Sequence, residues 1–248
     1  MNSKKTGLNS NQIKLIAIIA MTIDHLVWTL FPGTQHIWYV MALHIIGRLT
    51  APIMWFFIAE GCFYTHDMKK YIMRLFGFAV ISHFAYDFAF GIPYFSLKGG
   101  LFNRTSVMWS LALSVVCVAL SRSEKIPQAL KTILIIGCII LGFPSDWSCI
   151  AVVCPMYIYA HRGDFRLQAK DIIIWSFVYA AVYFIFLDKP YGILQMFTFL
   201  TIPILSHYNG RRGEWKGMKW LFYIYYPAHL FIIGLLRILL HGNISTIF

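Results

Sequence analysis

The sequence predicts an all-α integral membrane protein, a bundle of about nine transmembrane helices with its N-terminus in the cytoplasm. Three observations lead to this prediction. Hydrophobic residue types make up 59% of the 248 residues and charged types only 12%, about half the charged fraction of a soluble domain. The apolar residues form long runs, and Lys and Arg cluster between alternate runs. No polar stretch is long enough for a separate soluble domain, so we expect one polytopic membrane domain over residues 1–248.

A membrane-spanning helix needs about 20 mostly apolar residues. The segments that reach or approach this length are 12–31, 40–65, 69–90, 105–120, 130–143, 147–160, 170–187, 190–206 and 219–241. Several of them are short. The fifth and sixth could instead form a single re-entrant hairpin around residues 143–146, which would lower the number of full spans.

The basic residues predict the orientation of the chain. When the loops are assigned alternately to the two sides of the membrane, 16 of the 21 Lys and Arg residues fall on the side of the N-terminus. The other side keeps Lys98, Arg104 and Lys189. The positive-inside rule therefore predicts a cytoplasmic N-terminus and an external C-terminus. The net charge of +11 has this simple cause, so the expected partner is the lipid bilayer and not a nucleic acid.

Ionisable side chains inside a span are costly unless they are paired or hydrated, and they mark candidate functional positions. Those that lie away from the span ends are Asp24, His25, His44, Arg48, Glu60, His83, Asp87, His229 and Arg237. A rise of about 1.5 Å per residue places four of them at a similar depth, just outward of the midplane: His25, Arg48, His83 and His229. We therefore expect a single cavity that contains Asp24, His25, Arg48 and His83. The alternative is that these groups form interhelical hydrogen bonds that only pack the bundle.

Spacing along the chain predicts pairs among these residues. His83 and Asp87 are four residues apart and share one helical face, so the carboxylate could hold the imidazole in one tautomer for acid–base chemistry. Glu60 lies lower, near the cytoplasmic interface, where it could pair with Lys70 or Arg74.

Lys14 precedes His25 by eleven residues, which places both on one face of the first helix, about 16 Å apart along its axis. A cation at the cytoplasmic mouth suits phosphate, and an imidazole in the outer half suits proton abstraction. Histidine, guanidinium and carboxylate suffice for acyl transfer without a metal. No ligand spacing indicates a metal site, so none is predicted.

Several segments of the sequence resemble the TraX family. They are Lys14–His25 with its final Asp-His pair, Gly47-Arg48-Leu49, Pro52, Phe57–Gly61, His83–Asp87, the Asn103 region and Tyr226-Pro227-Ala228-His229. TraX proteins are linked to N-terminal acetylation of pilin subunits in conjugative systems, and the family resembles the wider group of transmembrane acyltransferases. In that group an Arg-x10-His pattern in the first span holds the essential histidine. Lys14 replaces the arginine here, which keeps a cation but loses the guanidinium fork.

The resemblance implies a membrane-embedded acyltransferase in the bacterial cytoplasmic membrane. It would transfer acetyl from cytoplasmic acetyl-CoA to an amine or hydroxyl acceptor near the outer face, such as a pilin N-terminus or another envelope molecule. His25 would be the general base, and Lys14 would bind CoA. The other residues implied in catalysis are Asp24, Arg48 and His83, with Asp87, Glu60 and His229 in support.

Two other functions stay open at this point. A proton-coupled secondary transporter would use the same buried charges as a proton relay, although such proteins usually show inverted repeats. A non-enzymatic assembly protein of a pilus or secretion complex would need no aligned buried charges. The sequence has no Walker loop, His-Glu-x-x-His or Gly-x-Ser-x-Gly motif, so ATP-driven transport and zinc proteolysis have no support.

Overall fold

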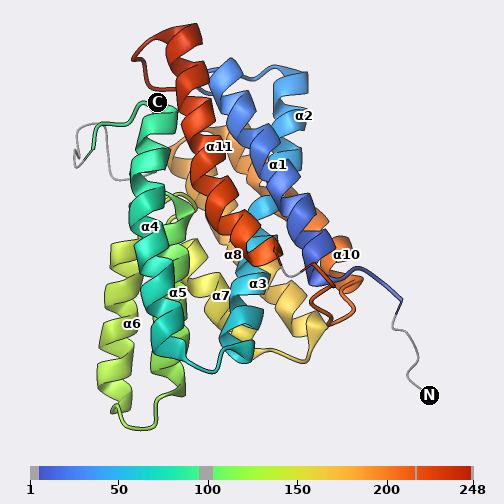
Figure 1. Ribbon diagram of the computed structural model, residues 1–248, viewed down its shortest axis with the longest axis vertical. Helices are drawn as coiled ribbons and strands as arrows, with labels where there is room; N and C mark the ends of the chain where they lie inside the picture. Colours follow the sequence, from blue (N-terminus) through green and yellow to red (C-terminus); the bar gives the residue numbers. More distant parts are fainter. Residues whose placement is uncertain (1–5, 95–102, 216, 247–248) are drawn as a thin grey trace.

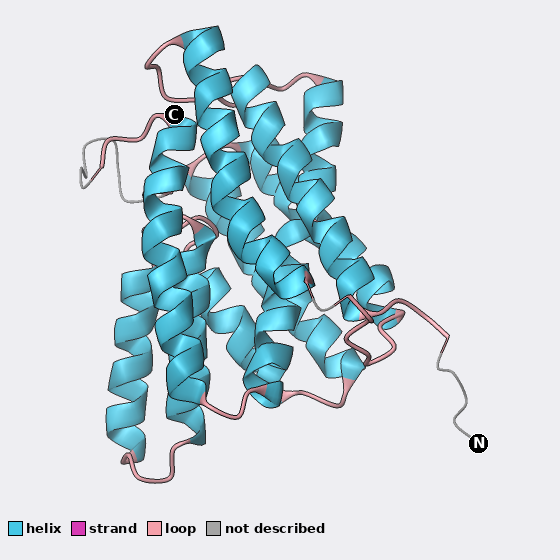
Figure 2. Cartoon of the chain, viewed as in Figure 1, coloured by secondary structure: helices cyan, strands magenta, loops and turns pink. Residues whose placement is uncertain are grey.

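The computed structural model describes residues 6–94, 103–215 and 217–246, and every regular element in these ranges is a helix (Figure 1). Figure 2 shows the same all-helical bundle with its connecting loops. The elements are α1 (Ser10–Leu30), α2 (Trp38–Gly47), α3 (Thr50–Tyr64), α4 (Met68–Phe90), α5 (Val107–Arg122), α6 (Gln128–Gly142), α7 (Ile150–Ala160), α8 (Phe165–Phe186), α9 (Lys189–Gln195), the short 3-10 helix η1 (Met196–Leu200), α10 (Thr201–Ser206) and α11 (Met218–His241). The predicted all-helical class is confirmed. Lys4, Lys5, Lys98 and Lys216, which contribute to the charge pattern above, lie outside the described residues.

Five helical segments of the described chain are long and apolar enough to cross a membrane: Ser10–Leu30, Trp38–Tyr64, Met68–Phe90, Phe165–Phe186 and Trp220–His241. The second of these combines α2 and α3, which are separated only by a turn at Arg48 and Leu49. Shorter apolar helices occupy Val107–Arg122, Gln128–Gly142 and Ile150–Ala160, and the predicted segment 190–206 is broken into α9, η1 and α10. The chain is therefore a multi-pass helical membrane protein, and nine full spans stay a prediction.

The turns gather at two ends of the bundle. Loops 65–67, 123–127 and 161–164 lie at the lower end in Figure 1, whereas loop 31–37 and the residues after α11 lie at the upper end. Residues 207–215 lie beside the start of α1, to which backbone hydrogen bonds between Leu8, His207 and Asn209 tie them. Loops 65–67, 123–127 and 161–164, residues 207–215 and the start of α1 are called the basic end, because they carry Lys125, Arg162 and Arg212. The other end of the bundle is called the opposite end.

Polar side chains fix the start of several helices. Asn9 and Gln12 form a capping box at α1, in which each side chain accepts a hydrogen bond from the backbone N–H of the other residue. The carboxylates of Asp67, Asp164 and Asp188 cap α4, α8 and α9. Such caps satisfy backbone N–H groups that have no partner inside the helix. The sequence therefore sets these helix boundaries locally.

The outer faces of several helices are apolar and exposed. α6 buries Cys138 and Gly142 against its neighbours but exposes Ile133 and Ile140, and α11 exposes Leu239. Soluble proteins rarely leave large apolar surfaces uncovered. A helix in lipid can do so, because its backbone hydrogen bonds are satisfied internally. These faces support the bilayer as the surroundings of the bundle.

The position of α1 decides which residues can meet in the interior. α1 packs against α2, α3 and α11, so the first and last helices of the chain are neighbours. α4 packs against α5 and α11, and α3 packs against α7. Residues that are far apart in sequence on α1, α2 and α11 are thereby brought to one region.

Candidate functional site

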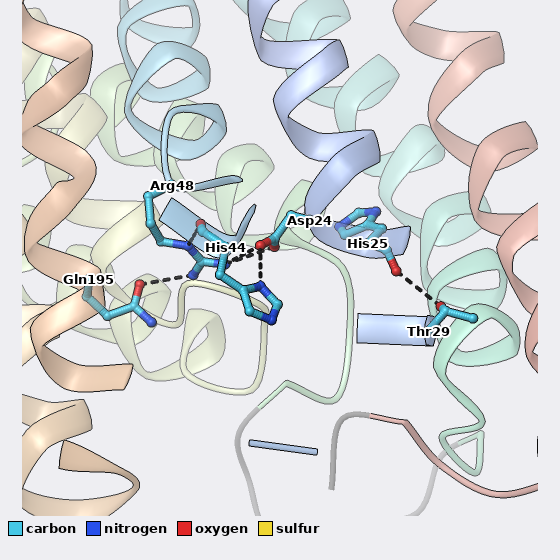
Figure 3. Close-up of polar contacts among 6 residues, drawn as sticks. All are labelled: Asp24, His25, Thr29, His44, Arg48 and Gln195. Carbon is cyan, nitrogen blue, oxygen red and sulfur yellow. Dashed lines mark hydrogen bonds and ion pairs between the residues drawn. The ribbon is translucent and has the colours of Figure 1, made fainter. Parts of the chain in front are cut away.

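An ion pair between α1 and the end of α2 forms the centre of the site (Figure 3). Nη2 of Arg48 donates to both carboxylate oxygens of Asp24, at 2.7 and 2.8 Å. Nδ1 of His44 donates to Oδ1 of Asp24 at 2.8 Å, and Nη1 of Arg48 donates to the side-chain oxygen of Gln195 at 3.0 Å. Asp24 and Arg48 therefore compensate each other in the interior, where a single unpaired charge would be strongly destabilising.

Two local features of α2 permit this arrangement. Arg48 directly follows the helix, and its Nε donates to the carbonyl of His44 at 3.2 Å, in the last turn, where the helix dipole is negative. Gly47 lies against Asp24, and a Cβ atom at this position would collide with the carboxylate. A larger residue at position 47 would therefore push α1 and α2 apart.

A chain of hydrogen bonds runs from α11 to His25. Nδ1 of His229 donates to the backbone oxygen of Tyr225 at 3.0 Å, as expected for a side chain four residues later in the same helix. In a neutral His229 this leaves Nε2 as an acceptor, and Nδ1 of His25 lies 2.9 Å from it. His25 must then carry its proton on Nδ1 and a lone pair on Nε2.

The lone pair on Nε2 allows His25 to accept a proton. Within the described residues no hydrogen bond occupies this atom, while the backbone oxygen of His25 accepts one from Thr29 at 3.1 Å (Figure 3). The side chain is only 7% exposed, and it lines a cavity. A neutral imidazole with a free nitrogen in a cavity is the arrangement that a general base requires.

The cavity beside His25, here called the His25 cavity, has a volume of about 180 Å³. Asp24 and Arg48 line it together with His25, and Thr34 from loop 31–37 places it toward the opposite end. The other acidic and amide residues that line it are Asn103, Asp146, Asp188 and Gln195. Asp24, His25 and Arg48, predicted to share one cavity, do so in the structure.

The turn between α6 and α7 forms one wall of this cavity. Asp146 and Trp147 line it, and the guanidinium carbon of Arg48 lies 5.2 Å from the centre of the Trp147 ring. Among the described non-glycine residues, positive φ angles occur at Asn103 (51°), Trp147 (63°) and Ser148 (50°). Such backbone conformations are uncommon, and strained residues cluster at functional sites. Two of the three line the His25 cavity, and the third adjoins it.

Neighbouring backbone groups hold this turn in place. The N–H of Arg104 donates to the carbonyl of Pro144 at 2.7 Å, and the N–H of Asp146 donates to that of Thr105 at 2.8 Å. The hydroxyls of Ser110 and Ser145 also contact each other. The tip of the α6–α7 hairpin is thus built into the bundle beside the site, which explains why α6 and α7 are short.

His83 does not join these residues. Its Nε2 lies 3.5 Å from Oδ2 of Asp87, as the four-residue spacing predicts, but it is not among the described residues that line the His25 cavity. The α4 residue that meets His25 is Phe90, with ring centres 5.4 Å apart. Phe90 follows His83 by seven residues, about 10 Å along the helix. The expectation that His83 shares one cavity with Asp24, His25 and Arg48 is therefore wrong for the lining that the structure describes.

Glu60 has a different partner from those predicted. Nε of Arg162 donates to Oε1 of Glu60 at 2.7 Å, so the expected pairing with Lys70 or Arg74 is wrong. The reason is that α3 packs against α7, whose following turn carries Arg162. Arg74 instead donates to the hydroxyl of Tyr223 at 3.0 Å. Glu60 is therefore part of a structural ion pair at the basic end.

Arg237 also has a structural role. Its guanidinium donates to the backbone oxygens of Phe88, Gly242 and Ile244 at 3.0–3.2 Å. Gly91 lies directly beneath it with a φ of 69°, and a Cβ atom there would approach Nη1 of Arg237 to 2.9 Å. Arg237 thus ties the ends of α4 and α11 together.

Three residues of the site were not predicted for it. His44 stands four residues before Arg48 and so shares its helical face, a spacing that could have identified it. Gln195 and Asp146 carry no comparable signal, because one is a neutral amide in a broken segment and the other lies in a turn. Only the packing of α9 and of the α6–α7 turn against α2 brings them to Arg48.

A second and larger cavity lies at the basic end. This cavity, here called the Lys14 cavity, has a volume of about 610 Å³ and is lined by Lys14, Arg74 and Arg212 as well as Glu60. Nζ of Lys14 lies 4.8 Å from the centre of the Phe57 ring, and within the described residues Lys14 forms no ion pair. The lining is therefore positively charged, since Glu60 already pairs with Arg162.

The described residues contain no group of three or more His, Cys, Asp or Glu placed to hold a metal ion.

The fold and the site together define a multi-pass helical membrane protein with a buried Asp–Arg–His network. Residues 9–237 match the family described as TraX protein, and the chain belongs to this family. It is 27% identical over 238 residues to the "Probable fimbrial assembly protein FimC, serogroup H1" of Dichelobacter nodosus, which covers 93% of this chain and 96% of that protein. No solved structure matches the chain.

Proposed function

We propose that this TraX family member is a membrane-embedded acyltransferase that moves acetyl from cytoplasmic acetyl-CoA to an amine or hydroxyl near the outer face. The observation that carries the proposal is the arrangement along α1. This helix contributes Lys14 to the larger cavity and His25 to the smaller one. With the basic end in the cytoplasm, nine passes and an external C-terminus, the donor and the acceptor reach the protein from opposite sides of the cytoplasmic membrane.

The Lys14 cavity suits the donor. Its volume of about 610 Å³ lies within the range of about 300–1,000 Å³ that is typical of small-molecule sites. Lys14, Arg74 and Arg212 present cationic groups to the phosphates of CoA, and aromatic residues such as Phe57 and Tyr223 cover the apolar part of the lining. Cationic groups bind phosphate oxygens through strong charge-assisted hydrogen bonds.

The relay from Tyr225 through His229 to His25 supports the assignment of His25 as general base. Nε2 of His25 removes a proton from the acceptor, whose nitrogen or oxygen attacks the thioester carbon. The C–S bond then breaks, and CoA leaves as a thiol with the proton from His25. The Nη1 group of Arg48 has a second N–H beyond the one given to Gln195, and this hydrogen can bind the developing oxyanion. Asp24 and His44 hold the guanidinium in place.

Aromatic side chains fill the space between the two cavities. Phe78 lines the Lys14 cavity, and its ring centre lies 6.1 Å from that of Tyr226. Tyr226 in turn lies 5.4 Å from His229, which contacts His25. The hydroxyl of Tyr225 contacts Thr22 of α1 at 2.6 Å. We propose that the acyl end of the donor passes along α11 from the Lys14 cavity to the His25 cavity. The aromatic side chains between the two cavities rotate to open this path.

The name of the Dichelobacter nodosus relative, a probable fimbrial assembly protein, favours a second candidate function, a non-enzymatic role in fimbrial assembly. Such a role would need a docking surface but neither a neutral histidine with a free nitrogen nor a cationic cavity. The two candidates therefore differ in what purified protein does with acetyl-CoA alone or with an added acceptor.

The proposal is tested with purified protein in detergent or nanodiscs. Release of free CoA from acetyl-CoA is followed with a thiol reagent, and envelope fractions with and without the protein are compared by mass spectrometry for a lost acetyl group. We expect CoA release by the wild type and its loss in His25→Ala. Acetyl-CoA that stays intact in the presence of envelope extract would reject the enzyme and leave the assembly role.

A further inference from the structure

Gln195 lies where the chain segment that follows α8 is broken. It is the last residue of α9, and its backbone oxygen accepts a hydrogen bond from the hydroxyl of Thr198 in η1 at 2.9 Å. The carboxylate of Asp188 caps the start of α9. Gly192 packs so closely on α8 that a Cβ atom there would approach the backbone nitrogen of Phe184 to 2.6 Å. The Gln195 side chain, which is 1% exposed, therefore starts from a rigid position.

The contact with Arg48 fixes which way the Gln195 amide faces. Nη1 of Arg48 donates to the amide oxygen at 3.0 Å (Figure 3), and the reverse orientation is excluded because a guanidinium only donates hydrogen bonds. The amide nitrogen then faces away from Arg48. The side chain has this one hydrogen bond within the part of the chain that the structure describes, so the N–H groups of the amide are unused there. Buried amides are normally paired, so these N–H groups are available to a ligand in the cavity that Gln195 lines.

The guanidinium of Arg48 is held in place with one hydrogen to spare. Nη2 donates to both oxygens of Asp24, Nε donates to the carbonyl of His44, and Nη1 donates to Gln195. Because a guanidinium has five N–H groups, these contacts leave one N–H on Nη1. Arg48 and Gln195 are in direct contact and both line the His25 cavity. They therefore place two hydrogen-bond donors side by side at one wall.

Negative charge that develops in the His25 cavity is disfavoured by the acidic part of its lining. Asp24, Asp146 and Asp188 line the cavity, and the guanidinium of Arg48 faces them. The charge of Arg48 is already shared with Asp24 through two hydrogen bonds, and Asp146 is close enough to interact with it as well. A neutral amide donor stabilises developing negative charge without adding another charge to the interior.

We infer that Gln195 is a catalytic residue, and that its amide nitrogen and Nη1 of Arg48 together bind the oxyanion of the tetrahedral intermediate. This inference rests on the proposed acyltransferase function. His25 removes a proton from the acceptor, whose nitrogen or oxygen forms a bond to the thioester carbon while the π electrons of the C=O bond move to the carbonyl oxygen. The two donors bind that oxygen. The C=O bond then re-forms, the C–S bond breaks, and the sulfur leaves as CoA thiol with the proton from His25.

A donor with sulfur in place of the carbonyl oxygen tests this contact, because sulfur is a weak hydrogen-bond acceptor. The two donors are acetyl-CoA and acetyldithio-CoA, and the oxygen preference is the ratio of their kcat/KM values, measured as CoA release. In Gln195→Glu the carboxylate still accepts from Arg48 but offers no N–H to the oxyanion. We expect the oxygen preference to fall at least about tenfold below that of the wild type, since loss of one oxyanion donor typically costs about 10²–10³-fold in kcat.

Two further variants complete the test. Gln195→Met has a similar length and adds no charge, so it serves if Gln195→Glu does not fold, and its oxygen preference should fall as well. Gln168→Met is the control. Gln168 is another buried glutamine, its amide donates to the carbonyl of Ile158 at 3.0 Å, and it is not in the described lining of the His25 cavity. This control should keep the oxygen preference of the wild type.

The outcomes separate Gln195 from the proposed function. A residue that only positioned Arg48 would be replaced by the carboxylate of Gln195→Glu, and the oxygen preference would then stay at its wild-type value even with a lower kcat. That result, or an unchanged preference in Gln195→Met, would overturn the inference while the acyltransferase stands. An equal loss in Gln168→Met would overturn it too, because the effect would be one of packing. A wild type that releases no CoA rejects the proposed function and the inference with it.

Discussion

Nδ1 of His25 lies 2.9 Å from Nε2 of His229, and this contact joins α1 to α11 across the whole length of the sequence. It also decides the protonation pattern of both rings, because His229 already gives its Nδ1 proton to the backbone of Tyr225. The two imidazole planes are nearly parallel, 4° apart. The last helix therefore sets which nitrogen of His25 is free to accept a proton.

Replacing His229 should test this relay. His229→Ala leaves His25 free to take either tautomer, so kcat for acyl transfer should fall, by less than the roughly 10²–10⁴-fold that a general base contributes. The KM for acetyl-CoA should not change, because His229 does not line the Lys14 cavity as described. His229→Gln should recover part of kcat, since its amide oxygen can accept from Nδ1 of His25. A rise in KM with unchanged kcat would contradict the relay.

His25 and His83 are a matched pair of histidines for substitution, because His25 lines the His25 cavity and His83 is not in its described lining. His25→Ala should lower kcat by about 10²–10⁴-fold while donor binding persists. His83→Ala should leave kcat close to that of the wild type, because His83 contacts Asp87 outside the His25 cavity. Steady-state kinetics of CoA release measure both. Equal losses in the two variants would place His83 in the catalytic set together with His25.

Glycine at position 47 should be needed for the close approach of α1 and α2. Gly47→Ala introduces a Cβ atom that collides with Asp24, and overpacking of this kind typically costs about 1–3 kcal/mol. Gly77→Ala is the control, since no atom within 4 Å would meet its Cβ and alanine favours a helix by about 0.5–1 kcal/mol. Thermal unfolding in detergent should show a lower midpoint for Gly47→Ala only. Equal midpoints would mean that α1 and α2 are farther apart.

Lys14 should contribute to donor affinity through charge. Lys14→Ala should weaken acetyl-CoA binding, and the loss should shrink as ionic strength rises, because salt screens exposed charges. Lys69→Ala removes an exposed lysine of the basic end that is not part of the described lining of the Lys14 cavity, and it should have little effect. Calorimetric titration with acetyl-CoA at two salt concentrations separates the variants. A similar salt-dependent loss for Lys69→Ala would indicate a general charge effect.

Reporter fusions test the orientation of the bundle. Fusions at Lys125 and Gly210, both at the basic end, should read as cytoplasmic, and a fusion at the C-terminus should read as external. The C-terminal fusion is the more demanding of these, because it depends on an odd number of passes. A cytoplasmic reading there would mean that a single segment, such as the broken segment 190–206, does not cross the membrane.

The sequence by itself determined the class of the protein and much of its helical structure. Long apolar runs cannot be solvated as loops in a bilayer and must form helices, and caps such as Asn9 and Asp67 mark where two of them begin. The sequence also identified Asp24, His25 and Arg48, because each is costly inside a span unless it is paired. Local chemistry sufficed for these conclusions.

Only the tertiary structure decided which of the buried polar residues meet. Helix tilt and the offset between neighbouring helices change the depth of a side chain by more than one turn, so His83 lies about 10 Å along α4 from the residue that contacts His25. The same packing brings Gln195 and Asp146 to Arg48 from a broken helix and a buried turn. The spacing of residues along one helix determines which of them share a helical face. Which faces contact each other depends on how the helices pack, and no single segment of the sequence determines that packing.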